Sequence, residues 1–294
     1  MKSYYQGLII CVISQCLFGS LYLFSYAMQP LAGTEIFALR MLVMAIGLWL
    51  LVITTLPAGS LRGFIRNHLG TSGKRWSLML LCTTILASQL WLFMWAPINQ
   101  EGANVAMGYF LFPLMMVLAG RIWRKEQLSP LQALALCLAM IGVGYEFYQH
   151  LSFSWTTLFV ALFYPPYYLI RRAMNIPALL GLTFDISIIA PIAFCYLYSQ
   201  TNAFSFIASE PRFYWLLALL GIVSTLAMYF NLLSSAILPL KLFGLLSYLE
   251  PALLFLCAVF LLDTPIQTSA YISYGFIWAG LLVLVINGFL HSKK

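Results

Sequence analysis

The chain has 294 residues, of which 63% are apolar and 8% are charged, and its formal net charge is +7. A soluble domain carries roughly 25% charged residues, so this composition excludes a soluble globule and indicates an integral membrane protein. The basic residues lie in short connections, which argues against a nucleic-acid surface. The expected partners are the lipid bilayer and a small-molecule substrate.

Breaks at proline, glycine and charge clusters divide the chain into ten apolar spans of about 20 residues, enough to cross a hydrocarbon core of about 30 Å. The first span has no small-residue cleavage site at its end, so we expect it to be retained as a helix. Only two connections, 57–76 and 200–212, are longer than a turn. The spans are predicted at 5–28, 34–56, 77–97, 103–122, 129–149, 153–172, 177–199, 213–238, 240–262 and 266–290.

The lysines and arginines set the orientation. If the N-terminus is cytoplasmic, thirteen basic residues fall on the inside and Arg212 alone falls on the outside. Short loops follow this bias well. We therefore expect both termini in the cytoplasm, with the protein in a bacterial-type inner membrane.

The two halves of the chain resemble each other. The fourth span reads GYFLFPLMMVLAGRIWRKEQLS from Gly108, and the ninth reads GLLSYLEPALLFLCAVFLLDTPIQ from Gly244. Five spans per half is an odd number, so the second half must be inverted relative to the first. The predicted fold is all-α, with two inverted five-helix repeats at 1–150 and 151–294, a pattern typical of secondary transporters.

Interrupted helices border the binding site in such transporters. Glycine and proline in mid-span mark the expected breaks, because proline removes a backbone donor. These positions are Gly19, Pro113, Pro165, Pro166 and Pro251.

Two carboxylates lie deep within predicted spans. Glu250 is about ten residues into its span, roughly 15 Å deep, and Asp185 is roughly 12 Å deep. Either could couple transport to protons or hold a substrate ammonium group; alternatively, a protonated carboxyl could serve helix packing alone. Pro251 should free the carbonyl of Ser247 and create a polar gap beside Glu250.

Arg40 lies about 9 Å inside the second span, and Glu35 precedes it by five residues. We expect the pair to anchor this span at the outer leaflet. The alternative is that Arg40 holds a substrate carboxylate, which suits a planar guanidinium.

Aromatic residues near the helix breaks are candidates for a pocket that binds a flat amphipathic or cationic solute. The alternative for each is helix packing or lipid contact. The candidates are Tyr22, Trp95, Tyr109, Tyr168 and Tyr248.

No cofactor or metal site is expected. All six cysteines fall in predicted spans without a CxxC pair, and no histidine lies at ligand spacing from them. An intramembrane enzyme is the main alternative class, but the sequence contains neither HExxH nor GxSxG. A receptor or scaffold would not explain the inverted repeat.

Several stretches carry a family resemblance that covers essentially the whole chain: FGSLYLFSYAMQPLAGTEIFALRML, QLWLFMWAPINQEGANVAMGYFLFPL, RKEQLS and GLTFDISIIAP. The chain resembles the EamA-type drug/metabolite transporters and is most similar to the RarD permeases among them. The resemblance implies a ten-helix inner-membrane exporter with a central cavity between two repeats. An amino-acid or lipid transporter of the same fold is the alternative. Proton-coupled and downhill transport, and a monomer and a homodimer, are all compatible with the sequence.

The predicted topology can be tested with reporter fusions. Fusions at residues 67 and 294 should report a cytoplasmic location, and a fusion at residue 205 a periplasmic one, because lysine and arginine accumulate on the inner side. Opposite signals at two of the three sites would contradict the inverted repeat.

Overall fold

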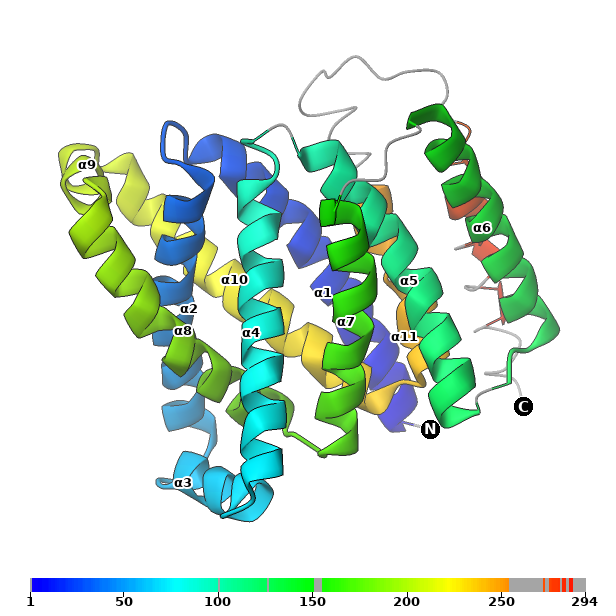
Figure 1. Ribbon diagram of the computed structural model, residues 1–294, viewed down its shortest axis with the longest axis horizontal. Coiled ribbons are helices and arrows are strands. Elements are labelled where there is room, and N and C mark those ends of the chain that lie inside the picture. Colours follow the sequence, from blue (N-terminus) through cyan, green and yellow to red (C-terminus); the bar gives the residue numbers. More distant parts are fainter. Residues whose placement is uncertain are drawn as a thin grey trace.

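The structure, a computed structural model, is a bundle of α-helices (Figure 1), and the residues that it describes contain no strand. It describes residues 2–99, 101–125, 127–150 and 155–253, together with 272, 275–280, 282–283 and 286–287. The end of the predicted span 240–262 and most of the span 266–290 lie outside these residues. The helices are α1 (Lys2–Ala27), α2 (Gly33–Thr55), α3 (Ser60–Phe64), the π-helical turn η1 (Ile65–Leu69), α4 (Gly73–Trp95), α5 (Gly102–Arg124), α6 (Pro130–His150), α7 (Trp155–Ala173), α8 (Ala178–Gln200), α9 (Ala203–Ser209), α10 (Arg212–Ile237) and α11 (Leu240–Leu246).

The long helices lie where the apolar spans predict them. The first eight spans correspond to α1, α2, α4, α5, α6, α7, α8 and α10, with ends that differ by at most four residues. Six described helices, namely α1, α2, α4, α5, α8 and α10, are long and apolar enough to cross a membrane. The helical class is therefore confirmed, while the count of ten spans stays a prediction.

The two longer connections form short helices at opposite ends of the bundle (Figure 1). The first contains α3 and η1, and the second contains α9. We call the end where α1 begins and α3 lies the N-terminal face. This face also holds the end of α7, the start of α8 and the end of α10, because successive long helices run in alternating directions.

Local sequence explains several helix starts. Before α6, Ser129 and Gln132 form a reciprocal cap: the Ser129 N–H donates to Gln132 Oε1 at 3.0 Å, and the Gln132 N–H donates to Ser129 Oγ at 3.2 Å. Pro130 occupies the first helical position, where its missing N–H costs no intrahelical bond. At α2, the side chain of Glu35 accepts a hydrogen bond from the Ala32 N–H at 2.7 Å.

Most of the expected helix breaks are absent. The helix α1 runs through Gly19, α5 runs through Pro113, and α7 runs through Pro165 and Pro166. A buried transmembrane helix tolerates proline because neighbouring groups can satisfy the freed backbone, and glycine by itself only weakens a helix. Those four predictions were wrong.

The interruption that the described residues do contain lies just before Pro251. The helix α11 ends at Leu246, Ser247 and Tyr248 form a turn, and residues 249–253 are helical again. Glu250 therefore follows directly after a break in its helix.

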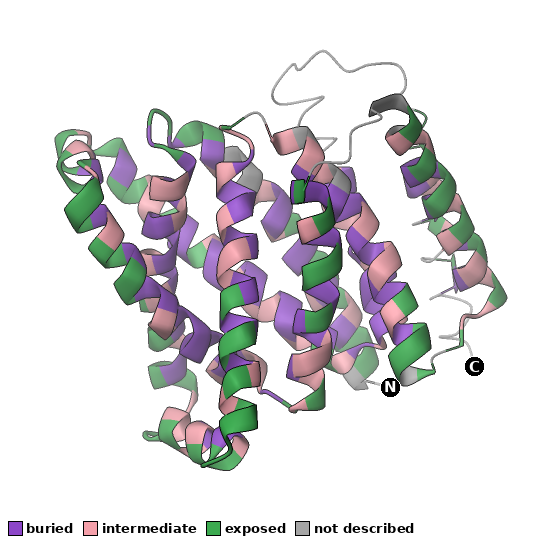
Figure 2. Ribbon diagram, in the orientation of Figure 1, coloured by how far each residue is buried: buried purple, intermediate pink, exposed green. Residues whose placement is uncertain are grey.

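The distribution of polarity is inverted relative to that of a soluble protein. Large apolar side chains such as Ile46, Ile53, Ile192 and Trp215 are exposed, whereas Arg40 and Asp185 are fully buried. Figure 2 shows buried residues where the central helices face one another and exposed residues on the outer faces. Such a surface suits hydrocarbon rather than water.

Glycine permits the close approach of α5 and α7. A Cβ atom on Gly108 would lie 2.7 Å from Val160 Cβ and 2.8 Å from the Thr157 carbonyl oxygen. At the same contact Thr157 Oγ1 donates a hydrogen bond to the Asn104 carbonyl at 2.7 Å. Small residues with interhelical hydrogen bonds are the usual means of helix association in membranes.

Substitution of Gly108 by Ala should lower the free energy of unfolding by about 1–3 kcal/mol, because the added methyl group overpacks this contact. Gly144 in α6 is the matched control, since a Cβ atom there meets none of the described residues within 4 Å. The Gly144→Ala variant should be unchanged or more stable by up to about 1 kcal/mol. Thermal unfolding of both variants in the same detergent measures the difference, and equal stability would contradict this account of the α5–α7 contact.

Candidate functional site

A small cavity lies among the helices of the bundle. Its volume is about 20 Å³, which is enough for about one water molecule. Helices α1, α4, α5, α7 and α10 contribute to its wall, together with the break that follows α11. The lining residues are Gln15, Phe18, Leu90, Phe93, Tyr109, Phe112, Tyr164, Tyr168, Met228, Asn231, Ser247 and Glu250.

Aromatic rings form one side of the cavity. The ring centroids of Tyr109 and Tyr164 are 6.1 Å apart, and those of Phe112 and Tyr164 are 5.2 Å apart. Phe93 packs edge to face on Tyr109 at 5.8 Å. These separations allow favourable ring contacts and present flat apolar faces beside phenolic hydroxyl groups.

Tyr164 lies at the centre of this cluster, although the sequence analysis did not select it. Tyr168 was selected for its position beside the prolines of α7, and Tyr164 precedes it by four residues. Residues four apart share a helix face, so this spacing could have indicated Tyr164 as well. Their rings are stacked at 6.1 Å.

Glu250 is half-buried and lines the cavity from the broken helix. The carbonyl of Ser247 beside it is not unpaired, contrary to the prediction, because it accepts a 3.3 Å hydrogen bond from the Glu250 N–H. Pro251 has no N–H to offer this carbonyl, so the donor three residues on takes its place. The helix therefore tightens at the break instead of leaving a bare carbonyl.

Arg40 lies behind the aromatic wall. Its side chain is fully buried, its Nε donates to Ser224 Oγ at 2.9 Å, and its guanidinium carbon is 5.7 Å from the centre of the Phe93 ring. Tyr109, Tyr164 and Glu250 are the described titratable groups that interact electrostatically with it. Neither terminal nitrogen of Arg40 has a hydrogen-bond partner among the described residues.

The expected pairing of Glu35 with Arg40 is absent. Glu35 bonds the start of its own helix, and Arg40 bonds Ser224 on α10. Five residues correspond to a rotation of about 140° around a helix, which places the two side chains on different faces.

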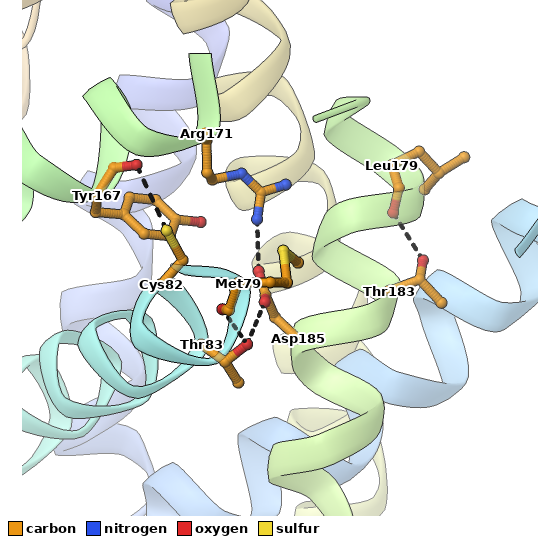
Figure 3. Close-up of polar contacts among 8 residues, drawn as sticks. All are labelled: Met79, Cys82, Thr83, Tyr167, Arg171, Leu179, Thr183 and Asp185. Carbon is orange, nitrogen blue, oxygen red and sulfur yellow. Dashed lines mark hydrogen bonds and ion pairs between the residues drawn. The ribbon is translucent and has the colours of Figure 1, made fainter. Parts of the chain in front are cut away.

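Asp185 belongs to a separate buried network. Its Oδ2 is 2.5 Å from Arg171 Nη1, and its Oδ1 accepts a 2.6 Å hydrogen bond from Thr83 Oγ1 (Figure 3). The three residues lie on α8, α7 and α4, respectively, and none of them lines the central cavity. Asp185 therefore joins three helices through an ion pair.

Two of the predicted aromatic residues lie elsewhere. Tyr248 packs in a cluster with Phe110 and Ala135, because it lies in the turn before Glu250 and points to another side of the chain. Trp95 stacks on Trp91 with a centroid separation of 5.0 Å, near the end of α4. Tyr22 lies in α1, but its side chain is outside the described part of the structure.

A second, larger space opens at the N-terminal face. This vestibule has a volume of about 900 Å³ and lies between the ends of α2, α7 and α10 and the start of α8. Tyr168 lines both the vestibule and the central cavity. Its hydroxyl donates a 2.5 Å hydrogen bond to Oδ1 of Asn231, which lines the central cavity.

The described residues contain no cluster of three His, Cys, Asp or Glu side chains that could hold a metal ion. Among the described residues, the polar groups of the central site are thus one carboxyl group, phenolic hydroxyl groups, the hydroxyl of Ser247, the amides of Gln15 and Asn231, and the buried guanidinium behind them.

Comparison with known proteins identifies close relatives over the whole chain. An uncharacterized transporter of Haemophilus influenzae is 51% identical over 294 residues, covering 100% of this chain and 98% of the relative. The chloramphenicol-sensitive protein RarD of Pseudomonas aeruginosa is 36% identical, covering 95% of this chain and 93% of the relative. RarD of Escherichia coli is 27% identical over 74% of each chain.

The structural comparison agrees in fold. A solved crystal structure of another protein aligns with a TM-score of 0.67 over 94% of this chain and 96% of the other, at 18% sequence identity. No protein-family profile matches the chain. The apolar helices and the relatives named as transporters indicate a multi-pass membrane protein. On the strength of the Haemophilus and Pseudomonas relatives, which match over more than nine tenths of their length, the chain belongs to the RarD family of EamA-type drug/metabolite transporters.

Proposed function

We propose that the protein is an inner-membrane secondary transporter that exports a small amphipathic drug or metabolite. One observation carries this proposal: an aromatic cavity in the middle of the bundle contains a carboxyl group next to a helix break. Glu250 lies ten residues beyond the start of α11, or about 15 Å, which is half of a hydrocarbon core of about 30 Å. A midplane site on a discontinuous helix is typical of secondary transporters.

The contacts between helices support two inverted repeats at 1–150 and 151–294. In two such repeats, α1 corresponds to α7, α2 to α8, α4 to α10 and α5 to α11. The α1–α10 contact then has its equivalent in α7–α4, and the α2–α10 contact in α8–α4. The α5–α7 contact has its equivalent in α11–α1. All of these contacts occur, and α2–α8 and α5–α11 map onto themselves. This arrangement would allow the two halves to alternate around the cavity, with both termini in the cytoplasm.

The two spaces along the bundle support alternating access. The vestibule reaches Tyr168 from the N-terminal face, and the cavity lies on the other side of the same residue. Separation of Tyr168 from Asn231 would join them, and closure would isolate a solute among the aromatic rings. Such gating is the usual role of mobile barriers in transport and catalysis.

Glu250 is the proposed coupling group, because a carboxyl group at this depth that reaches water alternately from each face can carry protons across. Tyr109, Tyr164 and Tyr168 would hold the solute. Asp185 is a weaker candidate for the coupling group, because its two carboxylate oxygens are already bonded to Arg171 and Thr83. Radiolabelled chloramphenicol is a suitable first probe, since the name of the Pseudomonas relative refers to it.

Replacement of Glu250 by Gln should abolish the response of probe flux to an imposed pH gradient while downhill flux persists, because Gln retains the shape and loses the titratable proton. The measurement is uptake into proteoliposomes with and without the gradient. Glu210→Gln is the matched control, since Glu210 is exposed and pairs with Arg212 near the start of α10. A wild-type gradient response in Glu250→Gln would refute proton coupling through this residue.

Replacement of Tyr164 by Ala should reduce probe flux at least about tenfold, since loss of one buried aromatic contact is worth about 1.4 kcal/mol or more. Tyr214→Ala provides the comparison, because this tyrosine is exposed on the outside of α10. Both variants are to be measured at equal amounts of reconstituted protein. Unchanged flux in Tyr164→Ala would assign the ring to helix packing.

A further inference from the structure

The connection between α2 and α4, residues 57–76, concentrates positive charge on the N-terminal face (Figure 1). It contains no aspartate or glutamate, and we call it the basic connection. Its four cationic side chains are all exposed: Arg62, Arg66, Lys74 and Arg75. None of them forms an ion pair with a described residue. Four positive charges therefore lie here without a counter-ion in the described part of the protein.

Apolar side chains hold the basic connection against the bundle. Phe64 and Leu69 are buried in a cluster with Phe184 of α8. The ring centroids of Phe64 and Phe184 are 6.2 Å apart, and those of Trp76 and Phe184 are 6.0 Å apart. The indole N–H of Trp76 donates to the Gly70 carbonyl at 3.0 Å. The apolar side of the connection thus faces the bundle, and its cations face outward from a packed element.

The four cations belong to one surface. Arg62 and Arg66 are four residues apart on the continuous turns of α3 and η1, a spacing that places side chains on one face. Lys74 and Arg75 lie in the first turn of α4. Arg75 Nη1 donates to the carbonyl of His68 in η1 at 3.3 Å, which holds the start of α4 beside η1.

Exposed apolar side chains show where this surface lies relative to lipid. Ile53 in the last turn of α2 is exposed, and so are Leu80 and Leu81 in α4. Leu80 follows Lys74 by six residues, or about 9 Å along the helix. The headgroup region of a bilayer is about 5–8 Å thick on each side. When Leu80 contacts hydrocarbon, the cations at the start of α4 therefore lie at the level of the headgroup phosphates.

Lys74 and Arg75 are placed unfavourably for the helix that they begin. The first turn of α4 contains no acidic residue, and the start of a helix carries partial positive charge that repels cations. Orientation in the membrane requires basic residues on one side of it, but not in this turn. A phosphate group beside the two side chains offsets the repulsion. Charge complementarity therefore favours an anion held at headgroup depth.

We propose that the basic connection is a docking surface for the phosphate headgroups of anionic phospholipids, which contact Arg62, Arg66, Lys74 and Arg75. The bound headgroups neutralise charges that the described residues leave unpaired. This surface does not rest on the proposed function, because it would serve a membrane protein with any solute.

Native mass spectrometry of the full-length protein in a neutral detergent tests the surface with two lipids of equal acyl chains. The wild type should bind phosphatidylglycerol at least about tenfold more tightly than phosphatidylcholine, because only the former has a net negative headgroup for the cations. Equal affinity for the two lipids would overturn the proposal and would leave the four charges to an acidic protein segment.

Two pairs of substitutions with equal loss of charge locate the surface. Arg62→Gln with Arg66→Gln should weaken phosphatidylglycerol binding about twentyfold, since each cation near an anionic headgroup is worth about fivefold. Phosphatidylcholine binding should not change. The matched control, Arg121→Gln with Lys125→Gln, removes two exposed cations at the end of α5 on the same face and should retain most of the affinity. An equal loss in both pairs would assign binding to net charge alone and refute the docking surface.

Lysine substitutions separate charge from packing. Arg62→Lys with Arg66→Lys should keep phosphatidylglycerol binding within about threefold of the wild type, because a lysine still presents a positive charge to phosphate. Thermal unfolding of each variant in the same detergent checks that the bundle is intact. Loss of binding in the lysine variant at an unchanged melting temperature would refute a surface built on charge.

Discussion

Polar side chains in this bundle have to find their partners inside the protein, because hydrocarbon offers none. The arrangement of the helices reflects this constraint. Ser14 bonds a carbonyl on α10, Arg40 bonds Ser224 on the same helix, and the ion pair between Arg171 and Asp185 joins α7 to α8. Removal of one partner of a buried ion pair typically costs about 3–5 kcal/mol, so these contacts fix the relative positions of helices whose outer surfaces only meet lipid.

The same constraint concentrates polar and ionisable side chains near the centre of the bundle. A carboxyl group, a fully buried guanidinium and several phenols occupy the centre of the bundle, where an apolar core would be easier to pack. Glu250 and Arg40 form no ion pair with each other in the described part of the chain. Under the proposed function, the unpaired nitrogens of Arg40 and the carboxyl group of Glu250 would find their partner in a ligand or a proton.

The sequence predicts the helices well and the side-chain neighbourhoods only in part. Length and apolar composition define a span, but they do not say which face of it turns inward. Glu250 and Tyr109 reach the cavity, whereas Tyr248, in the turn two residues before Glu250, packs in a cluster with Ala135 of α6. The pairing of Arg171 with Asp185 joins residues 14 apart across a turn, and no local pattern indicates it.

The position of Tyr168, which lines both the vestibule and the central cavity, has an electrical consequence. Where a vestibule of about 900 Å³ admits water to within one side chain of the central cavity, the low-dielectric barrier on that side is thin. A membrane potential falls mainly across the thicker barrier, which here lies between the cavity and the opposite face. In the proposed transport cycle, a charge that moves between that face and Glu250 would therefore cross most of the field, worth about 2.3 kcal/mol per 100 mV, whereas exchange with the N-terminal side would be nearly independent of voltage.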